Sequence, residues 1–469
     1  MSSLSPTRSG RLPTRSLIAY SLMTLPLASA GLPIALYLAP IYTDRVGLDL
    51  AGVGLALMAA RVVNIGVDML VGWLSDRDGV AGLRRKPWIA LGTPVMMLAS
   101  WRLFMPPDDA SLAYLFGWAL TFYVGWSLIT VPYGAWGAEL SDDYHERSRI
   151  VGYREGMTVV GLLMAVTAPV LVSSGLRGDR IAAMTADVQA FTWLTFLLLP
   201  ITAAILLLAV KERATTSAPL IRRRGAGLLA NGPFLVLLAA GVVSALGTGI
   251  NQTTTLAFYT YRARLAETAD VMIFVFFIAA LVGAPFWVWL GARLGKHRAL
   301  AAAAGWNALF LGIMPFIPAG NVAAYTGLQL ATGLAYAGPL ILGASMAADV
   351  IDLDWLKGGV QRGALFIAVW GVGQKLSEAV GVGIALPALK ALGFSPEHAL
   401  TAEAQNALLL ISVGAPMVLA LCSVPLIWLY PIDARAQRRI SAVIARRSGR
   451  HPAAVETSPS KQPIQETVG

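Results

Sequence analysis

The residues best suited to chemistry in this chain are charged and amide side chains that lie inside long apolar stretches of sequence. Arg61, Asn64 and Asp68 are spaced by three and four residues, so they share one face of a helix. Lys375 and Glu378 are three residues apart in a later apolar stretch. Ionisable groups at bilayer depth are costly unless paired or hydrated, and they mark ion and substrate pathways. These five residues are therefore candidates for ion or substrate binding.

Composition indicates what kind of chain must position these groups. Of the 469 residues, 56% are hydrophobic and only 13% are charged, whereas soluble domains carry about 25% charged residues. Twelve apolar stretches are each long enough to cross the ~30 Å hydrocarbon core as a helix. A soluble globular protein is excluded, and an all-α polytopic membrane protein with twelve transmembrane helices is predicted. The single Cys422 excludes a disulfide within the chain and a cysteine-built metal site.

The net charge is +10, and the distribution of the basic residues is typical of a membrane topology rather than of a nucleic-acid-binding surface. The basic excess lies in both tails and in the segment 211–231. If the N-terminus is inside, the tails and the even-numbered loops hold 27 of the 36 Lys and Arg residues, against 6 in the odd-numbered loops. The positive-inside rule therefore predicts cytoplasmic termini for a protein of the inner or plasma membrane, and no nucleic-acid partner.

The chain also reads as two halves of six helices each. Ala138-Glu139-Leu140-Ser141-Asp142, after the fourth apolar stretch, recurs as Ala348-Asp349-Val350-Ile351-Asp352 after the tenth. Duplicated halves are typical of transporters, with the substrate near the midplane between them. The predicted organisation is a tail (1–16), a six-helix bundle (17–210), a central loop (211–231), a second six-helix bundle (232–430) and a second tail (431–469).

The sharpest local motif follows the second apolar stretch. Gly72-Trp-Leu-Ser-Asp76-Arg77, followed by Arg84-Arg85-Lys86, resembles the G-x3-D-R/K…R/K-R signature of the major facilitator superfamily. Gly72 would permit close helix approach, while the charges would bond across the cytoplasmic faces of neighbouring helices. A gate latch is favoured over ordinary positive-inside charge. The full set assigned to this gate is Gly72, Asp76, Arg77, Arg84, Arg85, Glu139, Arg147, Asp349 and Arg362.

Longer stretches narrow the resemblance. Tyr42–Leu48, Ala60–Trp73, Arg85–Trp88 and Val131–Tyr133, with Lys375 later in the chain, resemble the glycoside-pentoside-hexuronide:cation symporter family. That resemblance implies the major facilitator fold, with two pseudo-symmetric six-helix bundles, and cation-coupled sugar transport by alternating access.

The resemblance also implies a cation site, from which this sequence departs. In the family, two carboxylates on the second helix bind the coupling cation. This sequence keeps the second of these carboxylates as Asp68 but has Asn64 in place of the first. A lone buried carboxylate can carry a proton, whereas Na⁺ prefers more oxygens and more charge, so H⁺ is favoured over Na⁺. Lys375 matches the family lysine and is expected to face Asp68.

Two roles remain open for Glu378: an intrahelical pair with Lys375, which is favoured, or replacement of the carboxylate missing at Asn64. The cation-coupling set is completed by residues of the fourth apolar stretch. It comprises Asp68, Asn64, Lys375, Glu378, Ser127 and Thr130.

The substrate side departs further from the family. The family binds its substrate with two carboxylates and a stacking tryptophan. This sequence has Ala28 and Thr130 at the carboxylate positions and Gly134 at the tryptophan position, so galactoside specificity is not carried over. A sugar or glycoside-like substrate is expected, with a lipid or lysophospholipid as the alternative. The candidate substrate-binding residues are Arg61, Tyr123, Trp126, Arg154, Asn251, Gln252 and Gln374.

An enzyme is the remaining alternative. Asp142-Asp143-Tyr-His-Glu146 imitates the acidic motif with which membrane prenyltransferases bind magnesium diphosphate. Arginines interleave this cluster and its counterpart near Asp349, and the two occupy equivalent cytoplasmic loops, so a gate network is preferred. The expected partners are a small-molecule substrate, a coupling cation and the lipid bilayer. A monomer without cofactor or metal is expected.

Overall fold

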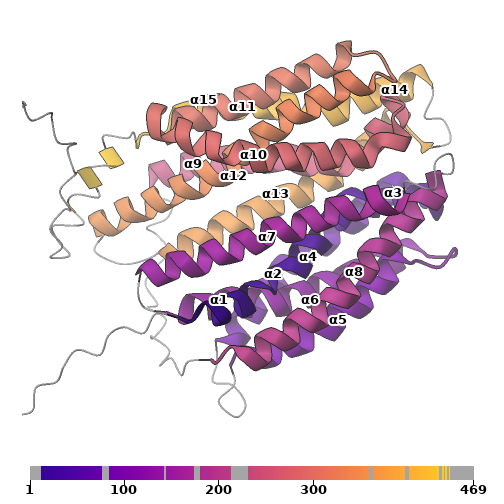
Figure 1. Ribbon diagram of the computed structural model, residues 1–469. Helices are drawn as coiled ribbons and strands as arrows, with labels where there is room; N and C mark the ends of the chain where they lie inside the picture. Colours follow the sequence, from indigo (N-terminus) through magenta and orange to yellow (C-terminus); the bar gives the residue numbers. More distant parts are fainter. Residues whose placement is uncertain are drawn as a thin grey trace, which may run out of the picture.

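The protein folds into long helices that lie side by side in two groups, one from each half of the chain (Figure 1). The computed structural model describes residues 12–76, 84–141, 144–173, 180–212, 231–358, 363–396, 401–432, 436–437, 439–440 and 443. Over these residues the regular structure is helical throughout, in twelve long rods, which confirms the predicted all-α polytopic fold.

The N-terminal half contains six of these rods. They are α1 (Thr14–Ser21) with α2 (Thr24–Leu36), α3 (Leu38–Pro40) and η1 (Ile41–Arg45), then α4 (Leu50–Ser75), α5 (Lys86–Phe104), α6 (Leu112–Glu139), α7 (Tyr144–Ser173) and α8 (Arg180–Ala209). The C-terminal half contains α9 (Gly232–Ala257) with η4 (Phe258–Arg262), η5 (Ala266–Thr268), α10 (Ala269–Leu294), α11 (Lys296–Ile313) with η6 (Met314–Phe316), α12 (Val322–Gly358), α13 (Gly363–Ala391), and α14 (Ala402–Leu409) with η8 (Leu410–Gly414) and α15 (Ala415–Trp428).

Ten of the rods are long and apolar enough to cross a membrane by length and composition. The other two, α5 and α13, contain charged residues and pack directly on α6 and on α4 and α9, respectively. α12 is 37 residues long, about 55 Å at 1.5 Å per residue, and so exceeds the hydrocarbon core. Asp349 therefore lies on a helix, and its expected position in a loop is wrong.

Prolines explain why the first rod is broken into pieces. A proline removes the hydrogen bond to the carbonyl four residues earlier and clashes with it. The break between α1 and α2 includes Leu22, four residues before Pro26, and α2 ends at Leu36, four residues before Pro40. Neighbouring helices pack around this broken rod, which can still span a membrane.

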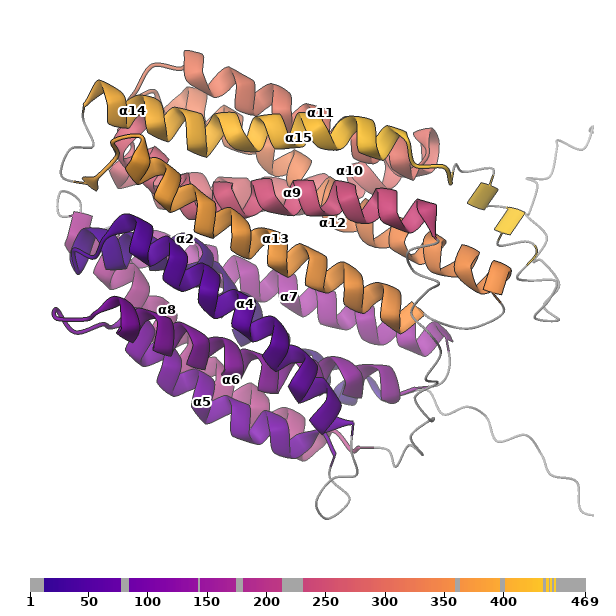
Figure 2. The same cartoon turned by 180° about the vertical axis from the view of Figure 1, so that it is seen from behind.

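The two halves meet in a symmetric way. α4 packs on α13, and α7 packs on α10, so the second and fifth rods of each half contact the fifth and second rods of the other. Figure 2 shows α4 and α13 running side by side between the two groups. The domain boundaries predicted above remain predictions.

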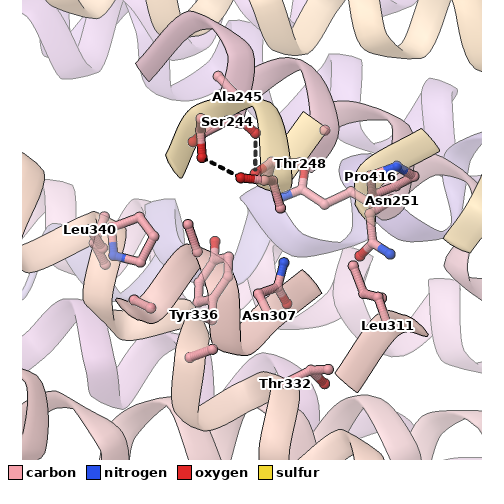
Figure 3. A pocket seen from close by; sticks show the side chains of 18 of the residues that line it. Ser244, Ala245, Thr248, Asn251, Asn307, Leu311, Thr332, Tyr336, Leu340 and Pro416 are labelled. Atoms are coloured by element: carbon pink, nitrogen blue, oxygen red, sulfur yellow. Dashed lines mark hydrogen bonds between the residues drawn. The ribbon is translucent and has the colours of Figure 1, made fainter. Parts of the chain in front are cut away.

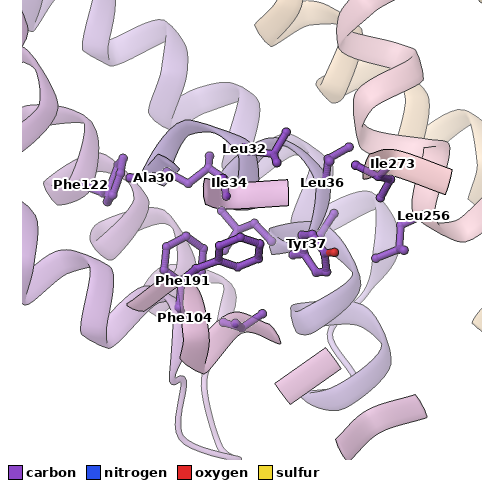
Figure 4. Packing of buried hydrophobic residues seen from close by; sticks show 14 of the residues in the cluster. Ala30, Leu32, Ile34, Leu36, Tyr37, Phe104, Phe122, Phe191, Leu256 and Ile273 are labelled. Carbon is purple, nitrogen blue, oxygen red and sulfur yellow. The ribbon is translucent and has the colours of Figure 1, made fainter. Parts of the chain in front are cut away.

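The two ends of the bundle are packed differently. We call the end where α1 begins and α15 ends the tail end, and the opposite end the far end. At the far end one apolar cluster joins the halves, because Ile34, Leu36 and Tyr37 lie in the same core as Leu256 and Ile273 (Figure 4). At the tail end of the C-terminal half a separate cluster forms, built only from that half, around Phe234, Trp287, Met346, Phe366 and Ile427.

Polar contacts between the halves follow the same asymmetry. At the far end, Tyr37 donates a hydrogen bond to Asp270, Tyr261 donates to Asp44 over 3.0 Å, and Lys390 pairs with Asp49. The hydrogen bond from Lys390 holds the pKa of Asp49 below its ordinary value. Between residues that the structure describes, no hydrogen bond or ion pair joins the halves at the tail end. Among the described residues, the polar and apolar contacts that join the two halves are thus concentrated at the far end.

Glycines set the distance between α9 and α13. A Cβ atom at Gly381 would lie 2.6 Å from the carbonyl oxygen of Leu246 on α9, well inside van der Waals contact. Gly371 lies on the same helix as Gly381, and no atom lies within 4 Å of the place where its Cβ would be. It therefore offers a matched control.

We expect Gly381→Ala to lower the free energy of unfolding by about 1–3 kcal/mol, because the added methyl overpacks a backbone contact. Gly371→Ala should leave it unchanged or raise it by roughly 0.5–1 kcal/mol through helix propensity. Thermal unfolding of the purified variants in detergent measures both effects. Equal shifts for the two variants would show that α9 and α13 are not in close contact.

Candidate functional site

The centre of the molecule holds an ion pair between the two halves. The Lys375 ammonium on α13 lies 2.5 Å from Oδ2 of Asp68 on α4. The Asp68 side chain is 18% exposed and that of Lys375 is 50% exposed, so the pair is only partly enclosed by protein. The expected meeting of Lys375 and Asp68 is present in this structure.

Ser127 on α6 completes a small cluster of oxygens around Asp68. Its Oγ lies 2.5 Å from Oδ1 of Asp68 and 2.9 Å from Oδ1 of Asn64, and both Ser127 and Asn64 are buried. A hydroxyl has one proton, so it can donate to only one of these acceptors at a time. Among the described residues no hydrogen bond connects Thr130 to this cluster; its hydroxyl donates to the backbone carbonyl of Trp126 over 2.9 Å.

Two further charged residues lie toward the far end from this ion pair. Arg61 is about two helical turns from Asp68 along α4, and Glu378 is a little less than one turn from Lys375 along α13. Nε of Arg61 donates to the hydroxyl of Tyr123 over 2.7 Å. Glu378 interacts electrostatically with Arg61 and, less strongly, with Lys375. The favoured intrahelical pairing of Lys375 with Glu378 is therefore not the arrangement seen, because Lys375 binds Asp68 on the other half.

A cavity of about 490 Å³ is lined almost entirely by the C-terminal half, from α9, α10, α11, α12, α13 and α15 and the short segments η4, η6 and η8. Leu36 on α2 is the one lining residue from the N-terminal half among the described residues. Three predicted substrate residues line it: Asn251, Gln252 and Gln374. Glu378, predicted for the cation site, lines it as well. These four side chains come from α9 and α13.

Sequence reasoning missed much of this lining. Figure 3 shows Asn307 and Tyr336 beside the cavity, with Thr248, Ser244 and Asn251 on the facing side. Gln329, Thr332 and Trp370 also line it. A signal was available, because amide and hydroxyl side chains inside apolar stretches are uncommon and need partners.

The predicted substrate residues of the N-terminal half lie elsewhere. Tyr123 holds Arg61, and Trp126 packs beside Phe122 with ring centroids 5.9 Å apart. Arg154 pairs with its neighbour Glu155 over 2.8 Å. None of Tyr123, Trp126 and Arg154 is among the residues that line the cavity of the C-terminal half.

The tail end of the N-terminal half carries a compact ionic network. Arg85, whose side chain is 4% exposed, lies 2.7 Å from Glu139 and 2.8 Å from Asp76. It also donates to the backbone carbonyl of Ser75 over 2.8 Å, and Arg84 pairs with the same Glu139. Burial raises the pKa of Glu139, but the hydrogen bonds from Arg85 and Arg84 outweigh it and leave that pKa below its ordinary value.

Glu212, just after α8, is a member of this network that the sequence did not reveal. Its carboxylate accepts hydrogen bonds from the backbone N–H groups of Arg84, Arg85 and Lys86 at 2.8, 2.9 and 2.5 Å. These donors open α5, so Glu212 satisfies the unpaired N–H groups and the positive dipole of that helix end. Its distance in sequence from the loop it binds concealed this role.

Gly72 behaves differently from its expected role. A Cβ atom there would meet Val131 at 3.6 Å, an ordinary van der Waals distance, so close helix approach does not require glycine in this conformation. Arg77 and Arg362 lie outside the described residues, as does the side chain of Arg147.

The C-terminal half has a matching tail-end pair. Lys296, which begins α11, lies 2.7 Å from Asp349 on α12. Asp349 is the counterpart of Glu139 in the internal echo, and each acidic residue binds a basic residue at the start of the neighbouring helix. The repeated sequence therefore corresponds to a repeated contact.

We expect Glu139→Gln to lower the free energy of unfolding by about 1–3 kcal/mol, because it leaves the buried Arg85 with fewer charged partners. Since the folded pKa of Glu139 is lowered, its contribution is fully present above the unfolded pKa and is lost as pH falls through the folded pKa. Thermal unfolding against pH measures this.

Glu155→Gln is the matched control, because its pair with Arg154 is 33% and 57% exposed and such pairs contribute about 0–1 kcal/mol. If Glu139→Gln is as stable as Glu155→Gln at neutral pH, Glu139 does not contribute to stability through the ionic network.

Sequence comparison places this architecture in a known family. The family model described as MFS/sugar transport protein matches residues 19–434. The sphingosine-1-phosphate transporter MFSD2B of Mus musculus is 26% identical, covering 88% of this chain and 87% of its own length. The sodium-dependent lysophosphatidylcholine symporter 1 of Homo sapiens is 25% identical, with coverages of 82% and 77%. The isoprimeverose transporter of Lactiplantibacillus pentosus is 23% identical, with 82% of each chain covered.

Solved structures agree on the fold. A bacterial homolog of the human lysosomal transporter Spinster, in an inward-facing and unoccupied conformation, superposes with a TM-score of 0.67 at 13% identity, covering 92% of this chain and 99% of that one. The nucleoside transporter NupG (D323A mutant) gives 0.62 at 13% identity, with coverages of 88% and 98%. The chain therefore belongs to the family of MFS/sugar transport proteins, which makes it an integral membrane transporter and not an enzyme.

Proposed function

We propose that this protein is a proton-coupled symporter of a sugar or glycoside-like small molecule, which it moves by alternating access. The observation that carries the proposal is the ion pair between Asp68 and Lys375, which joins the two moving halves at 2.5 Å through a titratable carboxylate. A proton on Asp68 would remove the charge that holds Lys375, so protonation and the contact between the halves are linked.

The packing of the two ends supports the alternation. Both tails are basic, so the tail end is assigned to the cytoplasm and the protein would be inward-facing here. In the opposite state the tail ends would close, bringing the network around Glu139 and Arg85 toward the pair of Lys296 and Asp349. We assign these two clusters to the cytoplasmic gate, each held in shape within its own half by the contacts above.

A proton fits the cation cluster better than Na⁺. Asp68 is its single carboxylate, and Asn64 and Ser127 add only neutral oxygens. Na⁺ would have to displace Lys375 and give up water for one charged ligand, whereas a proton needs one basic oxygen.

A sugar fits the cavity of the C-terminal half. Sugar hydroxyls both donate and accept hydrogen bonds, and Asn251, Asn307 and Gln374 offer amides for this purpose. Tyr336 and Trp370 offer ring faces on which a sugar ring can stack. The volume of about 490 Å³ lies within the range of roughly 300–1,000 Å³ for small-molecule sites.

A lysolipid is the second candidate, and two observations favour it. Apolar side chains such as Leu237, Phe276 and Leu340 share the cavity wall. The relatives from Mus musculus and Homo sapiens named above are lipid transporters, and the carboxylates expected for sugar binding are replaced at Ala28 and Thr130.

We expect sugars and their glycosides, but not lysolipids, to raise the thermal unfolding temperature of the purified protein, because a ligand stabilises the state that binds it. Asn307→Ala should remove this shift. Thr121→Val is the control, because Thr121 lies on α6 outside the cavity and bonds its own helix. Stabilisation by lysolipids alone, lost in Asn307→Ala, would replace the sugar with the lipid candidate.

We expect the sugar that gives the largest shift to accumulate in proteoliposomes under an imposed pH gradient, and not under a sodium gradient at equal pH. Asp68→Asn and Lys375→Ala should each abolish accumulation, since each breaks the linkage between the proton and the contact of the halves. Asn64→Asp should introduce a sodium response by adding a second carboxylate. Accumulation of the sugar driven by sodium alone in the unmodified protein would contradict proton coupling.

A further inference from the structure

Glu378 differs from every other residue around the cavity of the C-terminal half. It carries the single charged side chain among the described residues that line this cavity, whose other polar groups are neutral amides and hydroxyls. A single negative charge in a neutral, largely apolar cavity determines which ligands can enter favourably.

The two basic residues near Glu378 each have another hydrogen-bond partner. Lys375 binds Asp68 at 2.5 Å, and Nε of Arg61 donates to Tyr123 at 2.7 Å. Both act on Glu378 only electrostatically, and over the described part of the chain no hydrogen bond or ion pair reaches its carboxylate.

A half-buried carboxylate with no hydrogen-bond donor beside it is costly unless water or a ligand supplies the donor. The donor that would satisfy it can come from the cavity that it lines. Neutral hydroxyls would help, but an ammonium group supplies both a positive charge and donors.

Aromatic rings face the same cavity. The ring of Tyr336 lies with its centroid 5.3 Å from that of Phe276 and 6.3 Å from that of Phe277. Tyr336 is also within electrostatic range of Glu378, and Trp370 lines the wall. Ring faces attract cations, so these rings and the carboxylate favour the same kind of ligand.

We propose that the ligand of this cavity carries a positively charged amine, which binds at Glu378. The proposal rests on the assignment of this cavity as the substrate site and narrows the substrate from a sugar to an amine-bearing molecule such as an amino sugar. Glu378 acts as a specificity residue, while Asp68 keeps the coupling role.

The test measures binding to the purified full-length protein by calorimetry, with two matched pairs of probes. Glucosamine is compared with glucose, and choline with its neutral isostere 3,3-dimethyl-1-butanol, at a pH well below the pKa of the glucosamine ammonium. We expect glucosamine to bind about tenfold more tightly than glucose, a ratio typical of one charge-assisted hydrogen bond. Glu378→Gln should bring that ratio close to one, and Glu378→Asp should keep most of it.

Thr248→Val is the matched control, because Thr248 lines the cavity without charge and should affect glucosamine and glucose alike. Equal binding of glucosamine and glucose, or a ratio unchanged in Glu378→Gln, would overturn the amine proposal while leaving a sugar symporter intact. Binding of choline but of neither sugar would keep the amine proposal and overturn the sugar. Binding of none of the four probes would overturn the amine proposal.

Discussion

The rest of the structure depends on one constraint: charges placed inside a membrane are costly unless they are paired or face a hydrated or ligand-binding cavity. Asp68 and Lys375 satisfy it across the boundary between the halves. The same two helices pack closely nearer the far end, where a Cβ atom at Gly54 on α4 would lie 2.9 Å from the side chain of Leu386 on α13. Charge pairing and small-residue packing thus both hold α4 against α13. A substitution that shifts the packing of these helices would also shift the ion pair.

The two ends of the bundle solve different problems. At the tail end each half keeps an ionic network to itself, with Glu139 and Glu212 in one half and Asp349 in the other, so the halves can part without leaving buried charges alone. At the far end an apolar core and polar contacts such as that of Tyr261 with Asp44 cross between the halves. Contacts within each half at one end and between the halves at the other are what the proposed alternating-access cycle requires of one of its states.

The helices and their number could be predicted because long apolar stretches leave few alternatives. The pairing of Asp68 with Lys375 is an expectation from the family resemblance, consistent with the cost of an unpaired charge in a membrane. The motif groups Asp76, Arg84 and Arg85, and the echo singles out Glu139, but neither predicts that both arginines bind Glu139. The role of Glu212 could not be predicted, because a carboxylate that caps a helix far away in sequence leaves no local sequence pattern. The lining by Asn307 and Tyr336 depends on how six helices converge, and Glu378 turned toward that cavity instead of toward Lys375, a choice that spacing along one helix does not decide.

The apolar core shared at the far end has a thermal consequence. Opening that end moves side chains such as Leu36, Leu256 and Ile273 out of mutual contact and toward water. Hydration of apolar surface carries a positive heat capacity, so the enthalpy of opening must grow with temperature. The equilibrium between the two states would therefore be curved in temperature, and the closed far end would be favoured most within a limited range rather than steadily on cooling.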